Sequence, residues 1–369
     1  MKHYDSVLVT EATSLQNSTT INKLPIVNTQ AETSEKSNQS KRVWAKRLAL
    51  YRNANNKRAM IELIMTTSLF AAAFSATVWL ASISWWLVPA GMVASAFFLV
   101  RLFIIQHDCG HGAMFGSRAL NTWIGRILGV VTFTPYEYWR HSHAVHHAHS
   151  GNLDHRGIGD VPTLTVSEYK AKNWFGRLHY RVVRHPLALF GIGPSLIFII
   201  HQRVPVMYMT KGWKYWASTM FTNLGIIGLA TAAWPLIGLT TYILIMLPII
   251  AMAATIGVWL FYVQHQFEGT DWDRTGTWLH EPYALEGSSY YALPKPLMWL
   301  TGNIGIHHVH HMSSGIPFYR LPEVLRDFPE LKEASRLGFW ESFKCARLKL
   351  WDEANKRLVT FKEARALPA

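Results

Sequence analysis

The sequence predicts an all-α membrane protein with four transmembrane helices in two hairpins and a cytosolic helical cap that carries a metal site. Three observations in the 369 residues support this fold class. Two long stretches, 63–100 and 217–264, contain no Asp, Glu, Lys or Arg. Basic residues concentrate outside these stretches, and most histidines fall in tight clusters there. Since one span needs about 20 apolar residues, each stretch fits two helices, which argues against a soluble monomer.

The expected spans lie at 61–82, 84–105, 217–235 and 239–262. A 22-residue helix covers about 33 Å, enough to cross a bilayer. The first link contains Trp85 and Trp86, residues typical of the membrane interface. Arg101 is expected to extend its charged end to the cytosolic surface. A further apolar stretch, 187–200, is too short to span and is expected to lie in the interface or to re-enter.

The remaining segments are assigned by composition and charge. Residues 1–40 are rich in Ser, Thr, Asn and Gln and predict a disordered tail, and 41–60 form a basic juxtamembrane segment. The integral membrane domain is expected over 61–330, and a cytosolic C-terminal helical tail over 331–369. The net charge is +13, and the basic residues flank the spans, so both termini are expected in the cytosol. This placement favours anionic lipid, and nucleic acid is not an expected partner.

Histidines carry the strongest chemical signal in the chain. Three clusters have the spacings HxxxH, HxxHH and HHxHH, and one further histidine follows the last span. Residues at i, i+3 and i+4 share one face of a helix, and all four segments fall on the predicted cytosolic side. Imidazole suits Zn, Cu, Fe and Ni, and nine such donors fit two metal ions with four or five ligands each. The predicted ligands are His107, His111, His143, His146, His147, His265, His307, His310 and His311.

Polar residues beside these clusters are candidates for orienting the imidazole rings. They are Asp108, Asp154, Asp160, Gln264 and Asn303. For each of them an ordinary capping or turn role is the alternative. The roles of His141 and His149 stay open, and His308 is left out of the ligand set because HxxHH spacing turns it off the shared face.

Four segments together resemble the membrane fatty acid desaturases. They are HDCGH (107–111), WRHSHAVHH (139–147), FYVQHQFEG (261–269) and NIGIHHVHHMSSGIPFYRLPE (303–323), and the resemblance covers about 60–330. The resemblance implies a non-haem di-iron centre. Its two Fe ions activate O2, which is reduced to water while an acyl chain loses two hydrogens. The box histidines of the family match the clusters listed above, and its additional ligand matches His265.

HDCGH, with three residues between its histidines, is more similar to the acyl-lipid Δ12/ω6 and ω3 branch. This likeness implies insertion of a cis double bond, of Δ12/ω6 type, into a lipid-linked acyl chain. The cytochrome b5 signature HPGG does not occur in the sequence, so the resemblance implies a separate electron donor of ferredoxin or cytochrome b5 type. Chain length, carrier and oligomeric state stay open.

Two alternatives remain at this stage. An acyl-chain hydroxylase, alkane hydroxylase or carotenoid oxygenase would share the boxes, although HxxHH favours desaturation over the HxxxHH of alkane hydroxylases. The second alternative is a histidine-rich membrane metal transporter. The metal site of a transporter belongs near the bilayer midplane, whereas the four expected spans contain no histidine. The lack of targeting signals favours a bacterial inner membrane. An acyl tunnel could be lined by Phe98, Trp259, Phe261 and Tyr262.

Overall fold

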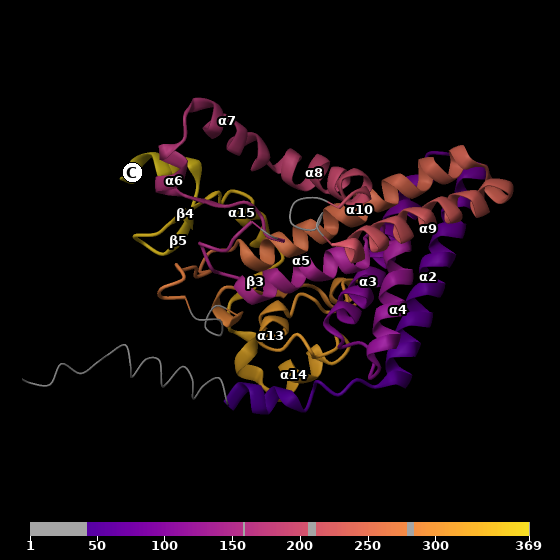
Figure 1. Ribbon diagram of the computed structural model, residues 1–369, viewed down its shortest axis with the longest axis horizontal. Coiled ribbons are helices and arrows are strands. Elements are labelled where there is room, and N and C mark those ends of the chain that lie inside the picture. The colour runs from indigo at the N-terminus through magenta and orange to yellow at the C-terminus, as the bar shows by residue number, and fades with distance from the viewer. Residues whose placement is uncertain (1–42, 158, 206–211, 279–283, 369) are drawn as a thin grey trace, which may run out of the picture.

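The computed structural model describes residues 43–157, 159–205, 212–278 and 284–368, so the predicted disordered tail lies outside the described residues. The chain is mostly helical, as predicted. Within these described ranges, four helices are long and apolar enough to cross a membrane. They are α2 (Asn56–Ile83), α3 (Val88–His111), α9 (Trp213–Ile237) and α10 (Leu239–His265). Figure 1 shows α2 beside α3 and α9 beside α10, as in two hairpins.

The four helices are longer than the sequence predicted, and both cluster-bearing ends extend. Helix α3 continues through His111 and ends at Gly112, whose φ of 69° is a left-handed conformation that favours glycine. Helix α10 continues to His265. At the other end, α9 and α10 are joined by Gly238 alone, with a φ of 79°. The first cluster and His265 are therefore parts of rigid helices, and not of loops that follow them.

The hairpin ends expose large apolar side chains. Trp86, between α2 and α3, is 93% exposed, and Leu236, near the end of α9, is 81% exposed. Contiguous apolar surface of this kind is characteristic of contact with lipid. Helix α3 lies innermost, packed against α2, α10 and α4 (Arg118–Val131). The chain is a membrane protein with α3 at the centre of its helix bundle.

Arg101 does not extend to the surface, which corrects the sequence-based expectation. Its guanidinium is buried, and its Nη2 lies 2.6 Å from a carboxylate oxygen of Glu62 on α2. The Trp299 ring covers its other side, 4.3 Å from the guanidinium carbon. A paired carboxylate and an aromatic ring within the bundle offset the cost of burying the charge.

The short apolar stretch after α7 (Trp174–Val183) folds as a chain of helical turns. These are η1 (Leu187–Ile192), α8 (Gly193–Ser195), η2 (Leu196–Ile200) and η3 (His201–Arg203). The segment bends by 54° from α7 and lies along α10. There, the Thr255 hydroxyl donates to the Phe190 carbonyl over 2.7 Å. Helix α5 (Tyr136–His149) packs against α3, α4 and α9.

A cap of short elements closes the remaining side of the bundle (Figure 1). Its helical pieces are α6 (Val166–Ala171), α12 (Lys295–Leu300), α13 (His307–Met312), α14 (Leu321–Asp327), η5 (Pro329–Lys332), α15 (Ser342–Cys345) and α16 (Phe361–Ala366). Its strands are β1 (Leu164–Thr165), β2 (Tyr290–Ala292), β3 (Arg336–Gly338), β4 (Leu350–Asp352) and β5 (Arg357–Val359). Strand β4 pairs with β1 and β5, and β2 pairs with β3.

The C-terminal segment 331–369 differs from the expected helical tail because it also contains β3, β4 and β5. Strand β4 is buried along its whole length, and its Trp351 stacks on Trp272 with ring centroids 5.2 Å apart. Inside this core the backbone N–H and C=O groups of β4 need hydrogen-bond partners, and pairing with β1 supplies them. A helix would satisfy these groups within itself. The domain bounds and the cytosolic side of the cap stay predictions.

Candidate metal centre

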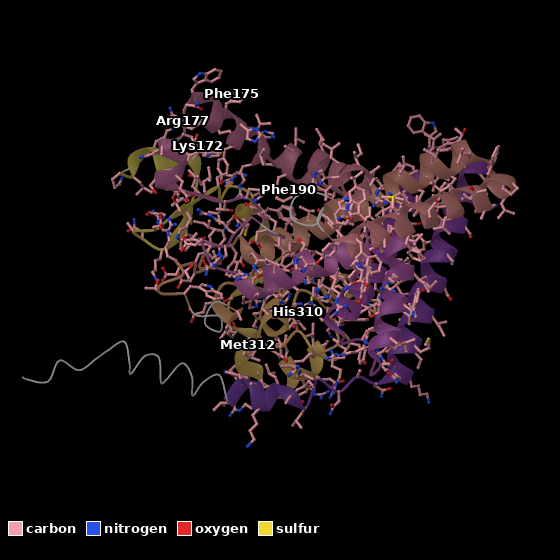
Figure 2. The ribbon with its side chains drawn as sticks, viewed as in Figure 1. Lys172, Phe175, Arg177, Phe190, His310 and Met312 are labelled. Carbon is pink, nitrogen blue, oxygen red and sulfur yellow. The ribbon has the colours of Figure 1, made fainter. Side chains whose placement is uncertain are left out.

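Nine histidines from four helices meet in the interior, although their sequence positions span more than 200 residues. Helices α3, α5, α10 and α13 supply them. They form two groups, and within each the candidate ligand atoms lie within 4.8 Å of one another. The five-histidine group is His107, His111, His143, His147 and His310, and the four-histidine group is His146, His265, His307 and His311. Figure 2 labels His310, inside the molecule near α13.

Neighbouring histidines on one helix divide between the two groups. His146 and His147 follow each other on α5, yet His147 belongs to the five-histidine group and His146 to the four-histidine group. Helix α13 does the same with His310 and His311. The rings of His147 and His311 stack across the boundary at 4.1 Å. The HxxHH pattern thus supplies two adjacent sites rather than one shared face for a single ion.

The protonation pattern leaves unprotonated nitrogens facing each other. The Nδ1 of His146 is hydrogen-bonded to the carboxylate of Asp160, and the Nδ1 of His265 lies 3.2 Å from the carbonyl oxygen of Gly287. Both partners are acceptors, so Nδ1 carries a proton in each ring, and in a neutral imidazole of this tautomer the Nε2 atom presents a lone pair. These two Nε2 atoms lie only 3.1 Å apart. Two lone pairs at this separation repel unless a cation lies between them.

The spacing of the other nitrogens agrees with ligands around an ion. Nε2 of His143 lies 3.0 Å from Nε2 of His111 and 3.0 Å from Nε2 of His147. In the four-histidine group, His307 Nε2 lies 3.0 Å from His265 Nε2. For a metal–nitrogen bond of about 2.1 Å, ligands at right angles are separated by about 3.0 Å. The donor set and its spacing therefore fit one first-row transition metal in each group.

Burial keeps the cap and α5 histidines in the neutral form that binds metal. Desolvation lowers the pKa of His143, His147, His307, His310 and His311 well below the usual value. Neighbouring histidines lower these pKa values further, because charges on adjacent rings repel. The Nε2 atom of His311 is buried without a hydrogen-bond partner. Such an orphaned nitrogen is expected of a ligand whose partner is a metal ion.

Two of the predicted orienting residues contact the histidines directly. Asp108 accepts from His107 Nδ1 at 3.0 Å and from the backbone N–H of Phe318 at 2.6 Å. Asp160 is the partner of His146 Nδ1. A carboxylate on the far nitrogen fixes the tautomer and the ring orientation of a metal-binding histidine. The two groups therefore have one such carboxylate each.

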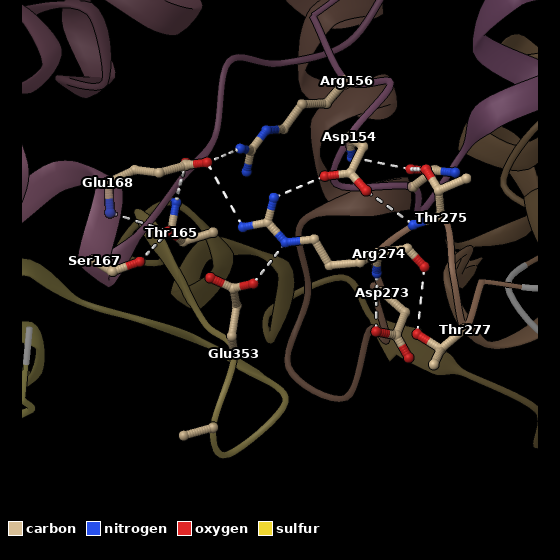
Figure 3. A network of polar contacts seen from close by, with 12 residues as sticks. Asp154, Arg156, Thr165, Ser167, Glu168, Asp273, Arg274, Thr275, Thr277 and Glu353 are labelled. Atoms are coloured by element: carbon tan, nitrogen blue, oxygen red, sulfur yellow. Dashed lines mark hydrogen bonds and ion pairs between the residues drawn. The ribbon is translucent and has the colours of Figure 1, made fainter. Parts of the chain in front are cut away.

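The other three predicted orienting residues lie elsewhere. Gln264 Nε2 donates to the Ile304 carbonyl at 2.9 Å, and Asn303 Nδ2 donates to the Phe318 carbonyl at 3.3 Å. Both hold the backbone around α13 and not an imidazole. Asp154 accepts from Arg274 at 2.7 Å in a surface network that also includes Glu353 (Figure 3). This network ties the loop after α5 to the C-terminal strands.

His141 and His149, whose roles the sequence left open, and His308, which it left out, belong to neither group. His308 Nε2 donates to the Leu331 carbonyl at 2.8 Å and anchors α13 to η5. His149 Nδ1 donates to the Val145 carbonyl at 3.0 Å. The His141 ring packs 5.5 Å from the ring of Tyr215.

Two aromatic residues at the site were not identified as ring partners from the sequence. Trp139 stacks on the His143 ring with centroids 4.7 Å apart and 17° between the planes. Phe261 packs against His146 at 5.0 Å and against His265 at 5.2 Å. Each precedes a histidine by four residues on its helix. That spacing was the available signal, because i and i+4 side chains are neighbours.

A cavity of about 770 Å³ leads to the histidines. His107, His143 and His307 border it, and its other walls come mainly from α3, α10 and the segment 187–203. Most of its lining is apolar, with residues such as Leu99, Leu189 and Ile250. Of the four aromatic residues expected to line a tunnel, Phe261 borders this cavity, whereas Phe98, Trp259 and Tyr262 do not.

Comparison with known proteins agrees with this arrangement. The fatty acid desaturase family model matches residues 83–343. A fatty acid desaturase of Bacillus subtilis (strain 168) is 40% identical over 325 residues, which cover 88% of this chain and 91% of that protein. An sn-1 acyl-lipid omega-3 desaturase (ferredoxin) of Synechocystis sp. is 27% identical over 287 residues, covering 70% and 73%. An sn-1 oleoyl-lipid 12-desaturase of Arthrospira platensis is 26% identical over 257 residues, covering 64% and 67%. The chain therefore belongs to the fatty acid desaturase family, and it is a desaturase enzyme of the membrane.

Proposed function

We propose that this enzyme uses a non-haem di-iron centre and O2 to insert a cis double bond into a lipid-linked acyl chain, with Δ12/ω6-type regiochemistry. The nine histidines of the two groups would hold the irons, one ion per group. The observation that carries the proposal is the histidine centre itself: Nε2 of His146 and Nε2 of His265 lie 3.1 Å apart, and His107, His143 and His307 of the same centre border a cavity that can take a long apolar chain. Ligand pockets commonly have volumes of 300–1,000 Å³, so the cavity is of substrate size.

The residues of this chain would position the reactants. The apolar walls would hold an extended chain so that one pair of methylenes lies at the histidines, and would keep water from that position. Asp108 and Asp160 would fix the rings of His107 and His146. When bound, the di-iron centre supplies the O2 activation that an unactivated C–H bond requires. Two hydrogens leave the chain, and O2 with two donor electrons and two protons becomes two waters.

The electron donor would be a separate protein of ferredoxin or cytochrome b5 type. Relatives from Synechocystis and Helianthus carry ferredoxin in their names. The net charge of +13 would suit an acidic donor, since complementary charge steers association. With basic segments on the cytosolic side, the site and both termini would face the cytosol, and we place the enzyme in a bacterial inner membrane.

Expression in a bacterial host whose lipids contain only saturated and monounsaturated chains tests the proposal. We expect a new double bond, located by mass spectrometry of derivatised chains, in dienes from oleoyl lipids. A His146→Ala variant should form no product and should lose iron, while Asp154→Asn, outside the centre, should keep both. Hydroxy acids in place of dienes would show that the enzyme hydroxylates the acyl chain and would refute desaturation. Full activity in His146→Ala would refute the metal assignment.

A further inference from the structure

The lining of the large cavity contains one amide that has no hydrogen bond. Gln202 is only 6% exposed, and it borders the cavity. Its Oε1 atom is buried without a partner, and its amide makes no hydrogen bond with any described residue. An unsatisfied polar group in a buried apolar setting costs free energy, so such a residue is retained where a ligand completes it. The walls around it, including Leu196, Ile197 and Phe198, are apolar.

The backbone holds Gln202 in a fixed place. Its neighbour Arg203 donates from Nη1 to Asn223 at 3.0 Å, and Asn223 Nδ2 donates back to the Arg203 carbonyl at 2.8 Å. Arg203 Nη2 also donates to the carbonyl of Phe133, in the turn between α4 and α5. Thr132 of the same turn borders the cavity as well. The residue after Gln202 is therefore tied to the turn that starts α5, and Gln202 itself shares the lining of the cavity with Thr132 of that turn.

The distance from that turn to the metal centre is fixed by a helix. Tyr136, the first residue of α5, and His143 are seven positions apart, which is about 10 Å along the helix axis. A polar contact at the turn would thus set how far an acyl chain reaches before it meets the histidines. Nε2 of the same amide makes no hydrogen bond with any described residue and is not one of the enclosed atoms without a partner, so this N–H group is the donor that a ligand in the cavity can reach. Among the groups of a lipid-linked acyl chain, the ester carbonyl next to the chain is the acceptor that matches.

We propose that the Gln202 amide donates a hydrogen bond to the ester carbonyl of the lipid substrate and thereby sets the position of the double bond. This inference rests on the proposed function, since it deepens the identity of the substrate. Gln202 is a specificity-determining residue on this account and has no part in holding metal. An ether-linked lipid with the same chains lacks the carbonyl and is therefore the matched control for the ester-linked lipid.

Binding of ester and ether lipids distinguishes the proposal. The purified holoprotein in detergent would be loaded with a fluorescent parinaroyl phosphatidylglycerol, which is then displaced by ester-linked or ether-linked phosphatidylglycerol. For wild type we expect roughly fivefold tighter binding of the ester, the effect of one net hydrogen bond. Gln202→Met, of similar size, should bind both lipids equally. Ile197→Met, which alters the wall without removing an amide, should keep the ester preference.

Product analysis gives a second readout that a structural role would not move. Gln202→Met should spread the double bond over neighbouring positions at normal iron content. An unchanged ester preference in Gln202→Met, or uniform loss of rate without positional change, would overturn the inference. If Gln202→Met does not fold, Gln202→Asn takes its place. For that variant we expect an ester preference at least halved and a second positional isomer of the product. An unchanged ester preference would contradict the inference. Failure of the proposed function would be seen separately, as wild type that binds ester lipid but forms no double bond.

Discussion

Replacing Asp108 by Asn tests the support of the metal centre with little change in shape. The carboxylate accepts two N–H groups, from His107 Nδ1 at 3.0 Å and from the backbone of Phe318 at 2.6 Å. An Asn side chain offers one acceptor oxygen, so one of these buried donors loses its partner. An unsatisfied buried donor costs about 1–3 kcal/mol of folding free energy. Loss of an orienting partner lowers metal affinity by about 10- to 100-fold.

The assay is iron retention against a competing chelator at pH 7, together with denaturant unfolding of the purified protein. Asp154→Asn is the matched control, because Asp154 contacts Arg274 and the Thr275 backbone on the surface and no histidine of either group. We expect Asp108→Asn to lose iron at chelator concentrations 10- to 100-fold lower than the control. Iron retention equal to that of the control, together with a stability equal to that of wild type, would refute this role for Asp108.

Three further predictions concern the bundle, the surface network and the cavity. Glu62→Leu leaves a buried arginine without its carboxylate and should lower unfolding free energy by about 3–5 kcal/mol, measured by denaturant titration; an unchanged midpoint would contradict the pairing. Hydrogen bonds from the Thr275 backbone and from Arg274 lower the pKa of Asp154 to about 2, so its contribution is complete above the unfolded pKa of about 3.9 and is lost as pH falls toward 2. Asp154→Asn should therefore have a lower Tm than wild type at pH 5, with the difference shrinking at lower pH; a pH-independent difference would contradict this. Trp139→Ala removes the ring stacked on a metal-centre histidine and should slow desaturation by roughly 10- to 100-fold in a product assay, whereas a rate within about twofold of wild type would contradict its role.

The sequence predicted the spans and the histidine clusters well because both depend on local patterns. Uncharged stretches longer than about 20 residues predict membrane helices with little influence from the rest of the fold. The confirmed features are the four long apolar helices and the histidine clusters that could bind metal. Helix bounds were less accurate: α3 and α10 extend through His111 and His265, since a helix can continue beyond the bilayer.

Features that depend on distant partners could not be predicted. The division of His146 and His147 between two groups depends on where α3, α10 and α13 approach α5. Arg101 was expected at the surface because its partner, Glu62, lies 39 residues away on another helix. The strands of the C-terminal segment form because β4 finds β1 nearly 190 residues earlier in the chain. Tertiary contacts decide these features, and a single sequence does not display them.

The ratio of iron to polypeptide tests the central claim most directly. Wild-type protein reconstituted with Fe²⁺ under anaerobic conditions should bind two iron ions per chain. His143→Ala, in the five-histidine group, and His265→Ala, in the four-histidine group, should each bind close to one. A ratio of one or less in the fully reconstituted wild type, or a ratio of two in either variant, would contradict the assignment of one iron to each group.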